Sequence, residues 1–160
     1  MLKLRFYLAG FTNLLAVITN NKMLMAATDN PHLNILVMMA KVDGETDQAE
    51  LELIRQIGAS NNVLPEDIEK IIDETSSEET IPSLENLDKK EKIELMTNLV
   101  MVMKIDGRID KEEMKFCLQV IKKLGYNEDA LFDLDSSTQI DPAQQINKDE
   151  IKARAEKFLQ

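Results

Sequence analysis

Two strongly apolar stretches, around residues 33–42 and 93–105, each run into a short polar corner and then into a segment with apolar residues at helical spacing. The segment after the corner ends at Gly58 in the first half of the chain and at Gly125 in the second. Because glycine readily adopts the left-handed turn that closes many helices, we expect a helix to end at each of them. A further short helix should follow each glycine, opened by Pro65 and by Asn127.

The two halves of the chain are related in sequence. When the chain is shifted by 63 residues against itself, eight of the fifteen positions from Leu36 to Glu50 are identical. The identical pairs are Leu36/Leu99, Val37/Val100, Met38/Met101, Lys41/Lys104, Asp43/Asp106, Gly44/Gly107, Asp47/Asp110 and Glu50/Glu113. This self-similarity predicts two related helical repeats, one over about residues 33–73 and one over about 96–134.

Polar segments separate the repeats from each other and from a last helix. Residues 74–82 are mostly polar and end in a proline, which favours a solvated connection. Asp88 is a natural N-cap for the helix leading to Met103, and Asn147 with Glu150 forms a capping-box pattern for a helix over about 147–159. These signals predict an all-α bundle of about seven to eight helices within residues 23–160, preceded by an apolar segment over residues 1–22.

Composition supports helices and narrows the partners. Only 4% of the 160 residues are aromatic, and there are five Gly and four Pro, which is unlike a turn-rich β fold. A net charge of −10 argues against nucleic acid and against an anionic membrane surface as partners, whereas cations and proteins remain candidates. The single cysteine, Cys117, cannot form an internal disulfide, so we expect a cytoplasmic protein.

The N-terminal segment leaves a second localisation open. Lys3 and Arg5 precede a mostly apolar run, residues 6–18, and small residues follow up to Ala27. This is the outline of a signal peptide, so export or membrane association through residues 1–27 is the alternative to a first amphipathic helix packed on the domain.

Both polar corners carry the pattern Asp-Gly-x-x-Asp-x-x-Glu, and most of it is explained by helix capping. Gly44 and Gly107 can take positive φ beyond a helix end. Asp47 and Asp110 are natural N-caps of the next helix, with Glu50 and Glu113 at the reciprocal position of a capping box.

The first aspartate of each corner is less easily explained. Asp43 and Asp106 each follow a helix, where the negative end of the helix dipole disfavours a carboxylate by about 0.3–1 kcal/mol. Either a local side-chain turn or a bound cation could favour them. Several carboxylates converging from a tight corner suit a divalent cation, with calcium as the first expectation. The glycine position excludes an EF-hand.

The doubled corner between apolar helices resembles the TerB family of bacterial tellurite-resistance proteins and the related domain of J-domain co-chaperones, over about residues 33–134. The resemblance implies a small all-helical domain in a stress-response setting. It also implies metal ligation by the repeated acids, which are Asp43, Asp47, Glu50, Asp106, Asp110 and Glu113, with Glu45 as an additional candidate. Arg108 departs from the acidic pattern, so either the first corner binds more tightly or both corners share one site.

The other reactive residue types suggest no catalytic site. His32 is the only histidine, and we expect it to be a surface or capping residue; Cys117 should be a core thiol. Five methionines at helical spacing should fill the core, namely Met38, Met39, Met96, Met101 and Met103.

We therefore expect a non-enzymatic domain that binds a divalent cation through its corners. One alternative is a protein interaction module whose acids are only helix caps. Another is a metal-dependent hydrolase, because clustered carboxylates that hold a metal can activate water.

Overall fold

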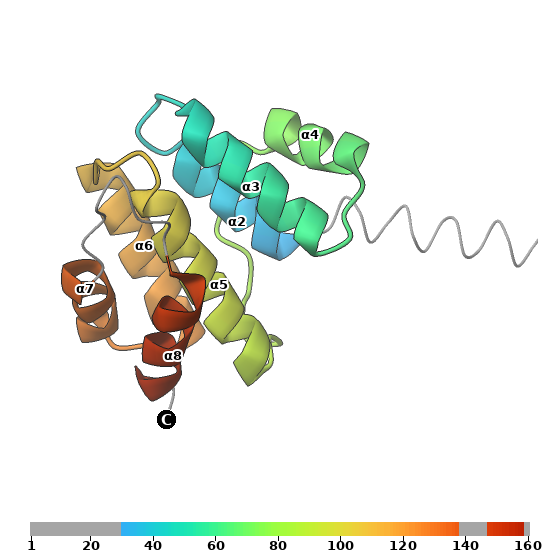
Figure 1. The fold of residues 1–160 in the computed structure, drawn as a ribbon. Helices are drawn as coiled ribbons and strands as arrows, with labels where there is room; N and C mark the ends of the chain where they lie inside the picture. The colour runs from blue at the N-terminus through green and yellow to red at the C-terminus, as the bar shows by residue number, and fades with distance from the viewer. Residues whose placement is uncertain (1–29, 138–146, 159–160) are drawn as a thin grey trace, which may run out of the picture. The chain divides into compact units, whose positions relative to one another are not determined.

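A computed structural model describes residues 30–137 and 147–158, and all the regular structure in these ranges is helical (Figure 1). The helices are α2 (Pro31–Ala40), α3 (Gln48–Ser60), α4 (Pro65–Glu74), α5 (Lys89–Lys104), α6 (Lys111–Leu124), α7 (Glu128–Ser137) and α8 (Lys148–Phe158). The predicted all-α class is therefore confirmed. The predicted N-terminal segment and its boundary at residue 22 lie outside the described residues. The helices form a compact unit that begins at Pro31.

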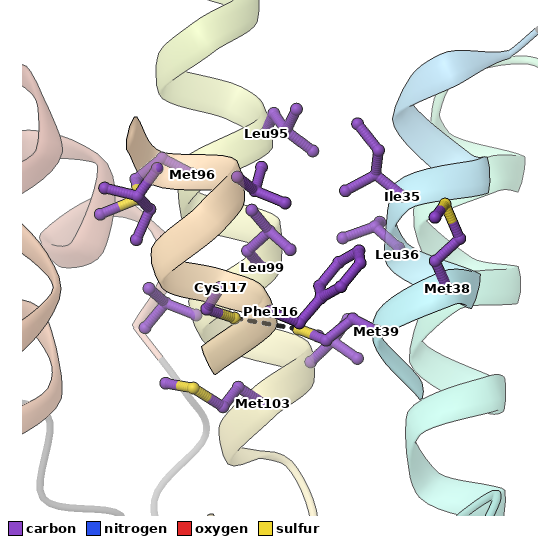
Figure 2. Close-up of a cluster of buried hydrophobic side chains, with 14 of the residues drawn as sticks. Ile35, Leu36, Met38, Met39, Leu95, Met96, Leu99, Met103, Phe116 and Cys117 are labelled. Atoms are coloured by element: carbon purple, nitrogen blue, oxygen red, sulfur yellow. Dashed lines mark hydrogen bonds between the residues drawn. The ribbon is translucent and has the colours of Figure 1, made fainter. Parts of the chain in front are cut away.

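The helices that bury the most side chains, α2 and α5, lie at the centre of this unit. The helix α2 packs against α3, α4, α5 and α6, while α5 also meets α7 and α8. Ile35 and Leu36 of α2 face Leu95 and Leu99 of α5 in the core (Figure 2). Burying a side chain of this size stabilises the fold by about 1.5–3 kcal/mol, so these two helices form the hydrophobic centre around which the others pack.

Methionines fill this core as the sequence predicts. Met38, Met39, Met96 and Met103 are at most 1% exposed, and Met101 is half-buried against the same cluster. The thiol of Cys117, on α6, lies among them and donates a hydrogen bond to Met39 Sδ at 3.1 Å (Figure 2). Cys117 is a core thiol, as predicted.

The prediction that a helix ends at Gly58 is wrong. The helix α3 continues to Ser60 and is capped at Asn61, after which Asn62 takes the left-handed conformation with φ of 60°. Gly58 is buried within the helix because α4 approaches there, and a Cβ at this position would stand 2.7 Å from Ile68 Cδ1. Gly125 does end α6, in the expected left-handed conformation with φ of 87°.

The connection between α4 and α5 is only partly solvated. Its acids Glu78 and Glu79 are exposed, whereas Ile81 and Leu84 are buried in the core. Lys123 of α6 donates a hydrogen bond to the Ile81 carbonyl at 3.1 Å. This apolar pair within a polar stretch fastens the connection to the bundle.

Lys41, which directly follows α2, binds the beginning of this connection, at the end of α4. Its Nζ donates to the Ile72 carbonyl, and to the Thr75 carbonyl at 3.0 Å. The ammonium therefore satisfies carbonyls at the C-terminus of α4, where a positive charge also matches the helix dipole.

Both predicted caps at later helix starts are present, one in a reduced form. Asp88 and Glu91 form the complete capping box of α5. Asn147 accepts a hydrogen bond from the Glu150 backbone N–H at 3.2 Å, but the Glu150 carboxylate turns to Arg154 instead of completing a box.

Across residues 30–137 and 147–158, no helix has the length and apolar character needed to cross a membrane.

Candidate cation site between the two acidic corners

The two acidic corners have the same backbone geometry. Gly44 and Gly107 both take positive φ, 84° and 76°. The Gly44 N–H donates to the Lys41 carbonyl, and the Gly107 N–H to the Lys104 carbonyl, each at 3.1 Å. The matching corners agree with the sequence repeat locally, while the relation between the complete halves stays a prediction.

The first aspartate of each corner forms a local turn. Asp43 Oδ1 accepts the Glu45 N–H at 2.9 Å, and Asp106 Oδ1 accepts the Arg108 N–H at 2.8 Å. These bonds order the corner and offset the unfavourable helix dipole. The local-turn explanation for these residues is confirmed, so their position alone is no evidence for a cation.

The second aspartate of each corner is an N-cap, as predicted. Asp47 accepts the Ala49 N–H at 2.6 Å, and Asp110 accepts the Glu112 N–H at 2.7 Å. The predicted capping box is complete in α6, where the Asp110 N–H donates to Glu113 Oε2 at 3.3 Å. For α3 the box is not formed, because the Glu50 carboxyl points to the other corner.

One open cavity of about 400 Å³ lies between the corners and is lined by all six predicted acids. Glu45, Arg108, Thr46 and Ile109 complete its lining. The two corners therefore line one common cavity. Arg108 also lines this cavity.

The innermost acids of the cavity are Glu50 and Glu113, which are only 2% and 6% exposed. Their side chains are hydrogen-bonded to each other across the two corners. Burial, together with the neighbouring Glu113 carboxyl, raises the pKa of Glu50 to about 8. Burial also raises the pKa of Glu113, although hydrogen bonds from the Asp110 backbone and from Glu50 oppose this. The pair therefore holds a proton at neutral pH.

The sequence contained a signal for this pair that capping patterns conceal. Glu50 lies in register with the buried Ile54 and Ile57, and Glu113 with the buried Cys117 and Val120. Spacings of four and then three residues place each glutamate on the apolar face of its helix. A carboxyl at such a position is buried on folding, which distinguishes it from an ordinary cap.

The chemistry of the donors fits a hard divalent cation, but the ligands are not preassembled. All the acidic groups offer carboxylate oxygens, which calcium, magnesium and manganese prefer over softer ligands. Each corner aspartate uses Oδ1 in its local bond, which leaves Oδ2 for a ligand. Within the described ranges, no three acidic, histidine or cysteine side chains stand close enough together to hold a metal ion. A cation would have to draw the corner aspartates toward the buried pair.

His32 lies away from this cavity and is not the surface or capping residue predicted. It is half-buried in the first turn of α2, and its Nε2 lies 2.9 Å from Asn98 Nδ2 of α5. Burial lowers the pKa of His32 to about 4.

These features define a class of protein: a helical domain in which a duplicated acidic corner lines one shared cavity. A family model described as tellurite resistance protein TerB matches residues 31–136, which include both corners and the buried glutamate pair. The chain belongs to the TerB family. No curated protein and no solved structure matches it.

Proposed function

We propose that this TerB-family domain binds one divalent cation, calcium first, in the cavity shared by its two corners. Glu50 and Glu113 would be the innermost ligands, and Asp43, Asp47, Asp106 and Asp110 would supply the remaining protein oxygens. The observation that carries the proposal is the buried carboxyl pair, since helix capping accounts for Glu113 but not for Glu50.

A buried pair of carboxyls is unfavourable unless something neutralises it. Like charges at short distance repel strongly where water is excluded, and the pair avoids this here by retaining a proton. A divalent cation would neutralise both carboxylates and bind them directly. The interaction-module alternative, in which the acids are only caps, leaves Glu50 unexplained because its carboxyl caps nothing.

The proposal is tested by thermal melting and titration calorimetry of the full chain with calcium, magnesium and manganese. The double variant Glu50→Gln/Glu113→Gln keeps the shape of the pair and removes its charge. A matched control, Glu74→Gln/Glu85→Gln, removes two exposed acids outside the cavity. We expect saturable stabilisation of the wild type and of the control, and at least a tenfold loss of affinity in the cavity variant.

A second variant, Asp43→Asn/Asp106→Asn, tests the contribution of the corner aspartates separately from that of the buried pair. Asparagine retains the oxygen that accepts the local backbone N–H, so the corners should fold while the charge is lost. We expect weaker binding than in the wild type. If no divalent ion has a saturable effect, or if both cavity variants respond like the control, the proposal is wrong.

A role in tellurite resistance is part of the same proposal and rests on the description of the matching family model. Cells that lack the protein and are then supplied with the wild type or with Glu50→Gln/Glu113→Gln test it by growth on tellurite. Equal tolerance in both would separate the buried pair from any role in resistance.

A further inference from the structure

Among the described helices, α3 and α6 carry the two innermost acids of the cavity and make no direct helix contact with each other. Each of them packs against α2 and α5 instead. The carboxyls of Glu50 and Glu113, in the first turns of α3 and α6, are hydrogen-bonded to each other. Both corners lie at this end of the bundle (Figure 1). The starts of α3 and α6 are therefore joined by side chains beside an open cavity, and not by a helix interface.

The helices that lead into the corners are firmly packed, whereas the corners are exposed. Near the end of α2, Met38 and Met39 are at most 1% exposed, and near the end of α5, Val102 and Met103 are fully buried. Such close packing leaves little room for movement. Residues 43–47 and 107–110 are exposed, and segments with few buried contacts rearrange at a lower cost in free energy than core helices do. Movement near the cavity should therefore be confined to the corners and the helix starts that follow them.

Direct coordination of an ion requires such a movement. Oxygens bound to one calcium ion lie at most about 5 Å apart, because each is about 2.3–2.6 Å from the ion. Within residues 30–137 and 147–158, no three acidic, histidine or cysteine side chains stand close enough together to hold a metal ion. The acids instead line a cavity of about 400 Å³. An ion that gathers ligands from both corners must therefore contract this cavity.

We propose that calcium binding closes the cavity by drawing the two corners, with the first turns of α3 and α6, toward each other, while α2 and α5 keep their packing. This inference rests on the proposed function, because it concerns the same ion in the same cavity. The attraction acts on two helix starts that no helix interface holds at a fixed distance in the described part of the chain. The ion-bound and ion-free forms then present different surfaces at this end of the bundle, which makes the cavity a calcium-dependent switch.

The experiment measures the distance between the starts of α3 and α6 in the full chain. Gln48 and Lys111 are the first residues of these helices, are exposed and do not line the cavity. Nitroxide labels on Gln48→Cys/Lys111→Cys report their separation by pulsed electron paramagnetic resonance. Brief labelling under native conditions leaves the fully buried Cys117 unlabelled, which mass spectrometry verifies. We expect saturating calcium to shorten the distance by about 2 Å or more, comparable to one metal–oxygen bond.

A matched pair of labels controls for a change of the whole bundle. Ala59→Cys/Lys122→Cys places them on exposed residues in the last turns of the same two helices, away from the cavity. We expect this distance to stay the same with calcium. The corner pair should also show no shift when Glu50→Gln/Glu113→Gln is added at the calcium concentration that saturates the wild type.

Hydrogen exchange of the unlabelled chain tests closure without any substitution. The backbone amides of Thr46 and Ile109 lie in exposed positions of the two corners, and calcium should slow their exchange by about tenfold or more. Saturable calcium binding with an unchanged corner distance and unchanged exchange would overturn the closure and leave the proposed function standing. Equal shifts in the corner pair and the control pair would also overturn it. Calorimetry without any saturable binding would overturn both proposals together.

Discussion

Glu50 occupies a position on α3 where the helix otherwise presents apolar side chains to the core. Its neighbours in that stripe, Leu51, Ile54 and Ile57, are buried. The carboxyl is accommodated because Glu113 of α6 reaches the same point and accepts or donates a hydrogen bond. Glu50 thus lies at the capping position of its own corner but bonds to a carboxyl of the opposite corner.

The raised pKa of Glu50 makes stability depend on pH in a definite direction. Its pKa is about 8 in the folded chain against an ordinary value of 4.5, so between these pH values the folded state binds more protons than the unfolded state. The free energy of unfolding should therefore fall as pH rises through this window, by at most about 1.4 kcal/mol for each pH step of one. Urea unfolding at pH 5.5 and 8.5 should show a smaller fall in Glu50→Gln. The exposed Glu45→Gln should behave like the wild type, and parallel profiles in all three proteins would refute this.

At the scale of elements, Gly58 sets the distance between α3 and α4. A Cβ there would stand 2.7 Å from Ile68 Cδ1 and 3.2 Å from Leu33 Cδ1, so Gly58→Ala should destabilise the fold by about 1–3 kcal/mol through overpacking. Ile68→Val removes the nearest atom and should recover part of this loss in the double variant. Chemical denaturation of the single and double variants measures the coupling. Additive losses would show that the Ile68 contact is not the cause.

Gly44 provides a contrast within the same class of substitution. A Cβ at Gly44 would meet no atom within 4 Å, so Gly44→Ala should lose stability only through its positive φ, by about 1–2 kcal/mol. Because Ile68 is remote from this strain, Ile68→Val should give no recovery in the Gly44→Ala background.

Lys41 joins α2 to the end of α4 across 34 positions of sequence. Lys41→Met keeps much of the side-chain length but removes the donor, which leaves the Ile72 and Thr75 carbonyls without their ammonium. We expect a loss of about 1–3 kcal/mol, together with faster hydrogen exchange in the last turn of α4. Glutamine at this position retains a donor and should recover part of the stability. Equal losses in both variants would mean that the bond is not what Lys41 contributes.

At the scale of the whole molecule, the titratable groups of His32 and Glu50 oppose each other in how acid changes the stability of the fold. His32 has a folded pKa of about 4 against 6.5, so between these values the unfolded state binds more protons and stability falls as pH falls. Glu50 acts in the opposite direction. Acidification from pH 6.5 to 4.5 should therefore stabilise His32→Gln more than it stabilises the wild type, as measured by urea unfolding. Identical changes in the two proteins would contradict this.

The sequence was sufficient for the class of fold, the two corners and most helix boundaries, because these depend on local signals such as Asp88, Asp110 and Gly125. It failed where distant segments decide. From the sequence Gly58 looks like a helix end, but it is needed because α4 packs beside it. His32 looks like a surface residue, but Asn98 of α5 contacts it in the folded chain. The convergence of Glu50 and Glu113 likewise depends on α2 and α5, because both α3 and α6 pack against these two helices.

The thiol of Cys117 is fully buried, and burial raises its pKa well above the usual range. Since it is the only cysteine of the chain, chemical labelling of this one thiol can measure how often the core opens. A thiol-specific reagent can react only in molecules in which α6 has separated from α2, so the labelling rate under native conditions measures how often the centre of the bundle opens. Divalent cations that bind between the corners should slow that rate.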